Sequence, residues 1–178
     1  MLEATTVTHR EPRAYATGAD FCWIFMRNME RLYLLSYLLT GAHSMAEKCF
    51  VAGLDASVEQ NRVFKEWAES WARRTIVQNA IRMMAPRPGE SEPGQFAGQR
   101  IEAARILALP AFERFVFVMS VFEGYSDQEC SLLLHCGRNE VTTARAQALQ
   151  RIGTSVNPTV LSETALNQEA FSRLAASA

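Results

Sequence analysis

Long hydrophobic runs are missing from this sequence. The longest candidate, residues 115–122, is far shorter than the ~20 apolar residues that a membrane helix needs. Residues 1–18 are polar and lack the apolar centre of a secretory signal. We therefore expect no membrane segment and a cytoplasmic location.

An excess of charge of one sign is also missing. The 18 Lys and Arg residues nearly balance the 19 Asp and Glu residues, which leaves a formal net charge of −1. Any contact with nucleic acid must therefore come from local patches. The 178 residues are enough to bury a core in one medium domain or two small ones.

Recognisable metal and catalytic motifs are lacking. Cys22, Cys49, Cys130 and Cys136 show no CxxC spacing, and buried free thiols are a better interpretation than disulfides or zinc. Cys130 and Cys136 flank His135, but no second ligand pair accompanies them. With no nucleophile–base pattern and no phosphate-binding glycine loop, we expect neither a metal, nor a cofactor, nor an enzyme.

Helix-breaking residues concentrate in residues 85–99, where three prolines and three glycines occur. Both flanks have helical periodicity, and no strand pattern bounded by hairpin turns is present. The sequence predicts an all-α protein with a helical domain at 19–84, a flexible linker at 85–99, a second helical domain at 100–152 and a C-terminal extension at 153–178.

Three helices are expected before the linker, at 19–41, 43–57 and 63–84. Gly41 is a good residue to end the first helix. Ser44 and Glu47 have the spacing of a capping box for the second. Trp67 and Trp71 continue an apolar stripe of the third helix, so we interpret them as core residues in preference to base-stacking platforms.

Further helices are expected after the linker, with Pro110 placed at the start of one of them. Residues 123–152 then predict a helix-turn-helix. A polar start at Ser126 and Asp127 leads into an apolar run, a short break covers His135–Asn139, and a second helical stretch follows.

Two stretches carry a specific pattern of spaced residues. The first lies in residues 32–50, and the second starts at residue 109 and extends to a valine twelve residues after Glu129. Through these patterns, residues 21–152 resemble a bacterial sigma factor of the extracytoplasmic-function group, which has two helical domains called region two and region four. The matching residues are Leu32-Tyr33, Ser36, Leu38-Leu39, Thr40-Gly41, Ala46-Glu47, Leu109-Pro110, Arg114, Glu123-Gly124, Ser126, Glu129, Val141 and Ala148.

The resemblance implies a set of partners. A sigma factor binds core RNA polymerase and promoter DNA, single-stranded at region two and double-stranded at region four, and is nucleoid-associated when active. An anti-sigma-type inhibitor is a further possible partner. The polymerase-binding positions would be Ala46, Glu47, Lys48 and Val51. Lys48 reverses the family's acidic charge and Val51 replaces a Gln, which puts standard docking in doubt.

The third helix carries the best basic patch. Residues 62–82 hold five basic residues and two acidic ones, and five minus two is plus three. Aromatic stacking on single-stranded DNA there would contribute roughly 1–3 kcal/mol per base. The alternative is that the arginines form a solvated face. The candidate contacts to single-stranded DNA are Arg73, Arg74, Gln78, Asn79 and Arg82.

The predicted recognition helix is poor in charge. Where the family has Lys, Ser and Arg, this chain has Thr142, Thr143 and Ala144, so weak or altered DNA reading is expected. The turn also departs from the family, because its Gly is replaced by His135, which can adopt φ > 0 but less readily than Gly. The candidate contacts to double-stranded DNA are Arg138, Asn139, Thr142, Thr143, Arg145 and Gln147.

Two hypotheses follow. In the first, the chain is a sigma-like transcription initiation factor, as the intact spacing in both modules indicates. In the second, it is a divergent sigma-fold protein that has lost promoter reading and acts through protein contacts, as Lys48, Val51 and the neutral recognition helix indicate. A DNA-binding regulator without polymerase contact is a weaker third alternative.

Overall fold

The structure is a computed structural model that describes residues 14–59, 62–89 and 101–154. In these residues it is helical apart from connecting segments and one isolated antiparallel bridge between Tyr15 and Phe64, which confirms the all-α prediction for this part of the chain. The elements are α1 (Gly18–Arg27), α2 (Met29–Thr40), α3 (His43–Glu59), the 3₁₀ turn η1 (Lys65–Trp67), α4 (Ala68–Met84), α5 (Ile101–Leu107), α6 (Ala111–Phe117), the π-turn η2 (Val118–Phe122), α7 (Asp127–Leu134) and α8 (Arg138–Thr154).

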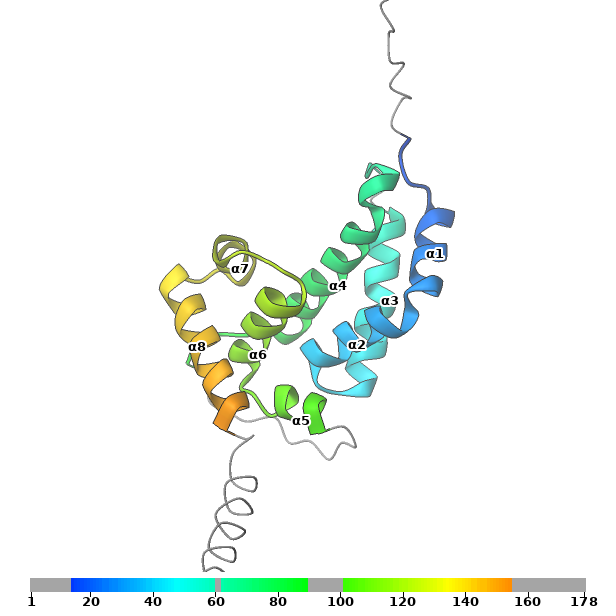
Figure 1. Ribbon diagram of the computed structural model, residues 1–178. Helices are drawn as coiled ribbons and strands as arrows, with labels where there is room; N and C mark the ends of the chain where they lie inside the picture. Colours follow the sequence, from blue (N-terminus) through cyan, green and yellow to red (C-terminus); the bar gives the residue numbers. More distant parts are fainter. Residues whose placement is uncertain (1–13, 60–61, 90–100, 155–178) are drawn as a thin grey trace, which may run out of the picture.

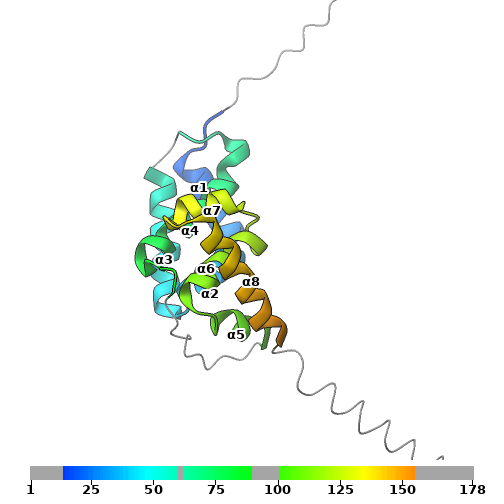
Figure 2. The ribbon, with the colours of Figure 1, turned by 90° about the vertical axis from the view of Figure 1, so that its left-hand side faces the viewer.

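The helices form two groups that lie side by side (Figures 1 and 2). In the first half, residues 14–89, α3 packs on α1, α2 and α4. In the second half, residues 101–154, α8 packs on α6 and α7. The halves also touch each other, because α2 contacts α5, α6 and η2, and α4 contacts α7. Separate domains with a flexible linker remain a prediction, since residues 90–100 and 155–178 lie outside the described residues.

The helix expected at 19–41 is divided in two. Asn28 has φ −106° and ψ 21°, and it separates α1 from α2. Its side-chain amide donates to the carbonyl of Ile24 at 3.1 Å, so the side chain competes with the helical backbone pattern. The predicted end is confirmed, because Gly41 has φ 80° and closes α2 in the left-handed conformation.

The predicted capping box of the second helix and the predicted start of the third helix are wrong, whereas α3 begins at His43 as expected. The amides of Met45 and Ala46 both bond to the carbonyl of Ala42, so α3 begins one residue before Ser44 and the predicted capping box is not its start. The third helix begins at Ala68 and not at Val63. Residues 63 and 64 are drawn into backbone hydrogen bonding with the N-terminal segment, where the amide of Ala16 donates to the carbonyl of Val63 at 2.7 Å.

One continuous apolar cluster fills both halves. It includes Phe21, Leu39 and Ile76 from the first half and Phe115 and Met119 from the second. Burial of this shared apolar surface favours the side-by-side arrangement of the halves. The tryptophan prediction is only partly confirmed: Trp71 is half-buried and packs against the cluster, whereas Trp67 is 54% exposed.

The cysteines are all free thiols in the structure, as expected. Cys49 and Cys130 are buried, and burial raises the pKa of each thiol to about 11, so both stay protonated at neutral pH. Cys22 is exposed, which corrects the expectation that the thiols are buried.

Helices α3 and α4 approach each other closely where they cross. A Cβ atom at Gly53 would lie 2.5 Å from Cδ1 of the buried Ile76, so only glycine fits at this position. Ser57, one turn further on, shares a buried 2.9 Å hydrogen bond with the hydroxyl of Thr75. The first half is therefore a tightly packed support for the surface of α4.

The side chain of Arg114 joins the two halves. Arg114 is only 4% exposed. In the second half, its guanidinium donates to the carbonyls of Leu107 at 3.2 Å and Leu109 at 3.4 Å. A third bond, of 3.3 Å, reaches the carbonyl of Leu39 in the last turn of α2. The last carbonyls of a helix lack intrahelical partners and carry the negative end of its dipole, so they suit a cation.

We expect Arg114→Met to lower the free energy of unfolding by about 2–3 kcal/mol, because three buried carbonyls lose a charged donor. Urea unfolding followed by circular dichroism measures this. Arg87→Met, at an exposed arginine, is the control and should change stability by less than about 0.5 kcal/mol. Equal effects of the two substitutions would contradict a joining role for Arg114.

Candidate nucleic-acid interface

Four of the five predicted contacts on α4 are accessible. Arg73, Arg74 and Gln78 are half-buried, and Arg82 is exposed. Asn79 is the exception, with 7% exposure. Its amide donates to the carbonyl of Thr75 at 2.8 Å and its oxygen accepts from Arg82 at 2.6 Å. Asn79 therefore positions Arg82 and is not free to read a base, which corrects its assignment as a DNA contact.

Two arginines of α4, Arg73 and Arg74, line a groove of about 660 Å³ between the two halves. One wall comes from residues 62–64, η1 and α4, and the other from the turn that follows η2 and from α7. The indole N–H of Trp71 is buried here without a hydrogen-bond partner among the described residues. We call this the α4 groove; its lining residues are Arg62, Val63, Phe64, Trp67, Ser70, Trp71, Arg73, Arg74, Gln78, Glu123, Gly124, Tyr125 and Glu129.

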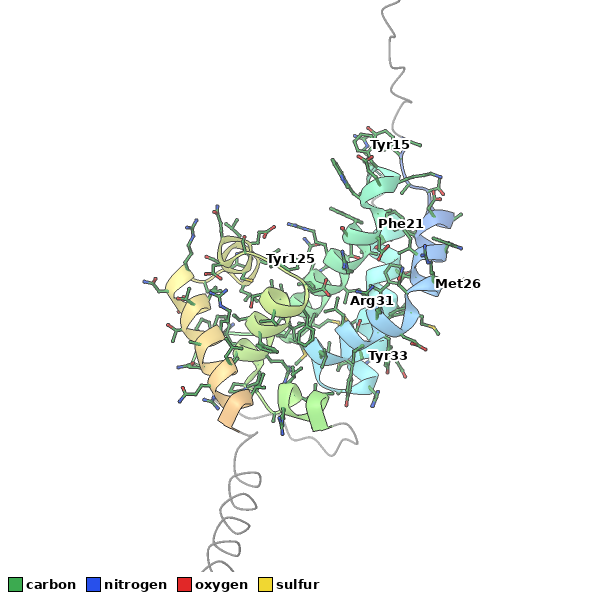
Figure 3. All side chains as sticks on the ribbon, in the orientation of Figure 1. Tyr15, Phe21, Met26, Arg31, Tyr33 and Tyr125 are labelled. Carbon is green, nitrogen blue, oxygen red and sulfur yellow. The ribbon has the colours of Figure 1, made fainter. Side chains whose placement is uncertain are left out.

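The second wall of the α4 groove is acidic and aromatic. Nε of Arg73 lies 3.8 Å from Oε2 of Glu123. Burial raises the pKa of the Glu123 carboxyl, while Arg73 and Arg31 act against that shift. Tyr125 points between α7 and α4 (Figure 3) and is itself half-buried, and burial raises the pKa of its phenol.

The helix–turn–helix pair of α7 and α8 is formed by local signals. Ser126 and Glu129 make a capping box at the start of α7, and their mutual hydrogen bonds lower the pKa of Glu129. His135 ends α7 with φ 51° and ψ 46°, so it adopts the left-handed conformation that a Gly would adopt more readily. Val141 and Ala148 on α8 are fully buried, so they anchor α8 in the core.

The polar face of α8 is open to solvent. Asn139, Thr142, Thr143 and Gln147 are all exposed, and Thr142 donates its hydroxyl to the carbonyl of Asn139 at 3.0 Å. Ala144, between them, is buried. Short polar side chains on this face are suited to hydrogen bonds with base edges, but they add no positive charge.

Two arginines of α8 form ion pairs with carboxylates of the same chain. Arg145 makes a bidentate pair with Asp127 at the start of α7, with Nη2 and Oδ2 3.2 Å apart. Nε of Arg151 lies 3.1 Å from Oε2 of the buried Glu113 on α6. These pairs fix α8 against α7 and α6, and they reduce the charge available for phosphate at Arg145, one of the predicted DNA contacts.

The start of α8 is less suited to phosphate than the sequence indicates. Arg138 is the first residue of α8 and is exposed. The amide of Gly137 donates to Oε2 of Glu140 at 2.6 Å, so a carboxylate already occupies part of the helix N-terminus. A phosphate at this position would meet a like charge.

The predicted polymerase-binding positions lie on α3. Glu47, Lys48 and Val51 are exposed, and they share one side of the helix because three to four residues separate the first two from Val51. Ala46 is fully buried. Its side chain cannot reach a partner, so Ala46 supports the helix from within and its assignment as a contact is corrected.

Three residues of the groove, Glu123, Tyr125 and Glu129, have no predicted role in a site. Glu123 and Glu129 belong to the spacing pattern. They are about fifty residues away from α4 in the sequence, and nothing in their local sequence indicates that they face that helix in the fold. The exposure of Trp67 is not predicted either, because the helical stripe extends through a segment where the chain instead forms η1. The groove is assembled by tertiary packing, including the contact between α4 and α7.

This surface is interpreted from its own geometry, because no family model and no curated protein matches the chain. None of the helices in the described part of the chain has the length and apolar character required to span a bilayer. Within residues 14–59, 62–89 and 101–154, no three His, Cys, Asp or Glu side chains gather into a group that could hold a metal ion.

A double-mutant cycle of Arg145→Met and Asp127→Asn should give a coupling energy of about 0.5–1 kcal/mol in the free energy of unfolding, because the pair is bidentate but about one-third exposed. Thermal unfolding of the four proteins measures it. A coupling energy of zero would mean that Asp127 does not hold Arg145 in solution and that Arg145 is available to DNA.

Proposed function

We propose that the protein is a sigma-like transcription initiation factor that binds core RNA polymerase and promoter DNA. The observation that carries the proposal is the helix–turn–helix pair, in which α8 is anchored by Val141 and Ala148 and presents Asn139, Thr143 and Gln147 to solvent. This arrangement suits a helix whose first turns contact base edges in a major groove. The upstream promoter element is the proposed double-stranded ligand.

The surface of α4 supports a second DNA contact. Arg73, Arg74 and Gln78 line the α4 groove beside the aromatic rings of Trp67 and Trp71. Cations that follow a phosphate backbone and aromatic faces that stack on bases are the combination that binds single-stranded DNA. We propose that the melted strand of the promoter contacts this side of α4, while the exposed face of α3 binds polymerase.

A second candidate function is favoured by the paired arginines of the helix–turn–helix. Arg145 and Arg151 have carboxylate partners, and Glu140 caps α8, so little charge remains for phosphate. A divergent sigma-fold protein that competes for a protein partner, such as polymerase or an anti-sigma-type inhibitor, needs no such charge. Retention of polymerase by a chain that shows no binding to promoter DNA would identify this candidate.

Polymerase binding is tested by pull-down of core RNA polymerase with the tagged full chain at low salt, followed by transcription from the promoter upstream of the gene. Glu47→Arg should weaken retention about tenfold, because the substitution reverses an exposed charge on the proposed contact. Glu59→Arg, at the far end of α3, is the matched control and should bind normally. No retention of polymerase by the unmodified chain would remove both functions that involve polymerase.

Single-stranded DNA binding is tested by the double substitution Arg73→Ala and Arg74→Ala. We expect weaker binding and a salt dependence whose logarithmic slope is shallower by about 1.4, or about 0.7 for each phosphate that the variant no longer neutralises. Fluorescence anisotropy of a labelled promoter strand over a salt series measures both. Arg87→Ala is the control, and an unchanged slope in the double variant would exclude α4 from the DNA site.

A further inference from the structure

One face of α4 combines aromatic rings with hydrogen-bond donors. The side chains of this face line the α4 groove at steps of three or four residues: Trp67, Trp71, Arg74 and Gln78. Such spacing places them in one row along the helix. The aromatic rings lie at the start of the row, and the cation and the amide lie at its end. The row therefore suits a ligand that has a flat ring at one end and an anion at the other.

Several donors in the α4 groove make no hydrogen bond within the described part of the chain. The indole N–H of Trp71 is buried there without a partner. The guanidinium of Arg74 and the phenol of Tyr125 interact electrostatically, but neither donates a hydrogen bond to a described residue. Tyr125 points between α7 and α4, toward the groove (Figure 3). A ligand rich in acceptor oxygens, such as a phosphate chain, matches these donors.

The opposite wall of the α4 groove supplies acceptors. Oε2 of Glu123 lies 3.8 Å from Nε of Arg73, and the Glu123 side chain is only 13% exposed. In dinucleotide-binding folds, a carboxylate close to the phosphate site accepts a hydrogen bond from a ribose hydroxyl. The sugar of DNA lacks the 2′-hydroxyl that makes such a bond. A carboxylate beside the arginines is therefore better suited to a ribonucleotide than to a DNA strand.

The size and shape of the α4 groove agree with a ligand of this kind. Its volume of about 660 Å³ lies within the range of roughly 300–1,000 Å³ that is typical of small-molecule sites. Trp67 and Gln78 are eleven residues apart, which is roughly 16 Å along a helix. Phe64 packs edge-on against Trp67, with 5.7 Å between the ring centroids, and the indole stays 54% exposed. A base can therefore stack on the indole.

We propose that the α4 groove binds a ribonucleoside 5′-polyphosphate. The base stacks on Trp67, and the phosphates bind Arg74 and Gln78. Between these ends, Glu123 accepts a hydrogen bond from the 2′-hydroxyl of the ribose, and the N–H of Trp71 donates to an oxygen of the ligand. This ligand requires neither DNA nor polymerase, so the inference goes beyond the proposed function and does not rest on it.

The test is calorimetric titration of the full chain with ATP, dATP and inorganic triphosphate, in the absence of DNA and polymerase. We expect ATP to bind about tenfold more tightly than dATP, because dATP lacks one hydrogen bond to a carboxylate. Inorganic triphosphate should bind at least about tenfold more weakly than ATP, because it has no ring to stack. Equal affinities for the three ligands would overturn the inference, since any basic surface gives that result. No binding of ATP would overturn it as well.

Two variants separate the roles of the groove residues. Arg74→Ala should weaken the binding of ATP and of dATP alike, by about tenfold. Glu123→Ala should bind the two nucleotides equally, and a preference for ATP that survives in this variant would contradict the role of Glu123. The matched controls are Arg87→Ala and Glu30→Ala, at exposed positions outside the groove, and both should bind as the unmodified chain does.

Circular dichroism checks that each variant is folded. If Glu123→Ala does not fold, the comparison of ATP with dATP on the unmodified chain still decides whether the ribose is recognised. Failure of the chain to bind polymerase or promoter DNA would refute the proposed function and would leave the expected nucleotide affinities unchanged.

Discussion

The arrangement of the molecule depends on a buried cation at the end of a helix. Burial lowers the pKa of the Arg114 guanidinium, and no carboxylate among the described residues pairs with it. Its two terminal nitrogens donate to carbonyls, including that of Leu39 in the last turn of α2, whereas its Nε is buried without a hydrogen-bond partner among the described residues. A cation without a counter-ion is tolerated there because the helix end supplies unpaired carbonyls and a negative dipole. Because α6 is held in this way, the direction of η2 is fixed, and Glu123 at its end lies beside Arg73 of α4.

Internal pairing of cations recurs through the structure and changes what the charge count means. The basic patch of residues 62–82 has a surplus of three positive charges when only its own segment is considered. In space, Glu123 and Glu129 join it from the other half and reduce that surplus. Arg145 meets Asp127 in the same manner. The electrostatic surface of the folded chain is therefore more nearly neutral than its local sequence indicates, and affinity for phosphate depends on which pairs are open.

Helical periodicity and helix-end signals were enough to predict the all-α class, the end of α2 at Gly41 and the break that begins at His135. These features have local causes, such as a left-handed backbone or an apolar stripe. The break at Asn28 and the late start of α4 could not be predicted, because each depends on a side chain or a distant segment that competes for backbone hydrogen bonds. The acidic wall of the groove escapes prediction for a similar reason: residues far apart in sequence define it.

The neutral face of α8 and the paired charges of the α4 groove fit one physical scheme. Phosphate contacts supply most of the affinity of a DNA-binding protein, whereas base contacts supply specificity. Asn139, Thr143 and Gln147 are exposed and could make base contacts, but they carry no positive charge for contacts to phosphate. A protein of this kind binds free DNA weakly, yet it reads a promoter once a larger partner holds it there, because tethering replaces affinity by effective concentration. In the proposed function core RNA polymerase is that partner, so the face of α3, and not the charge of α8, decides whether promoter reading is retained.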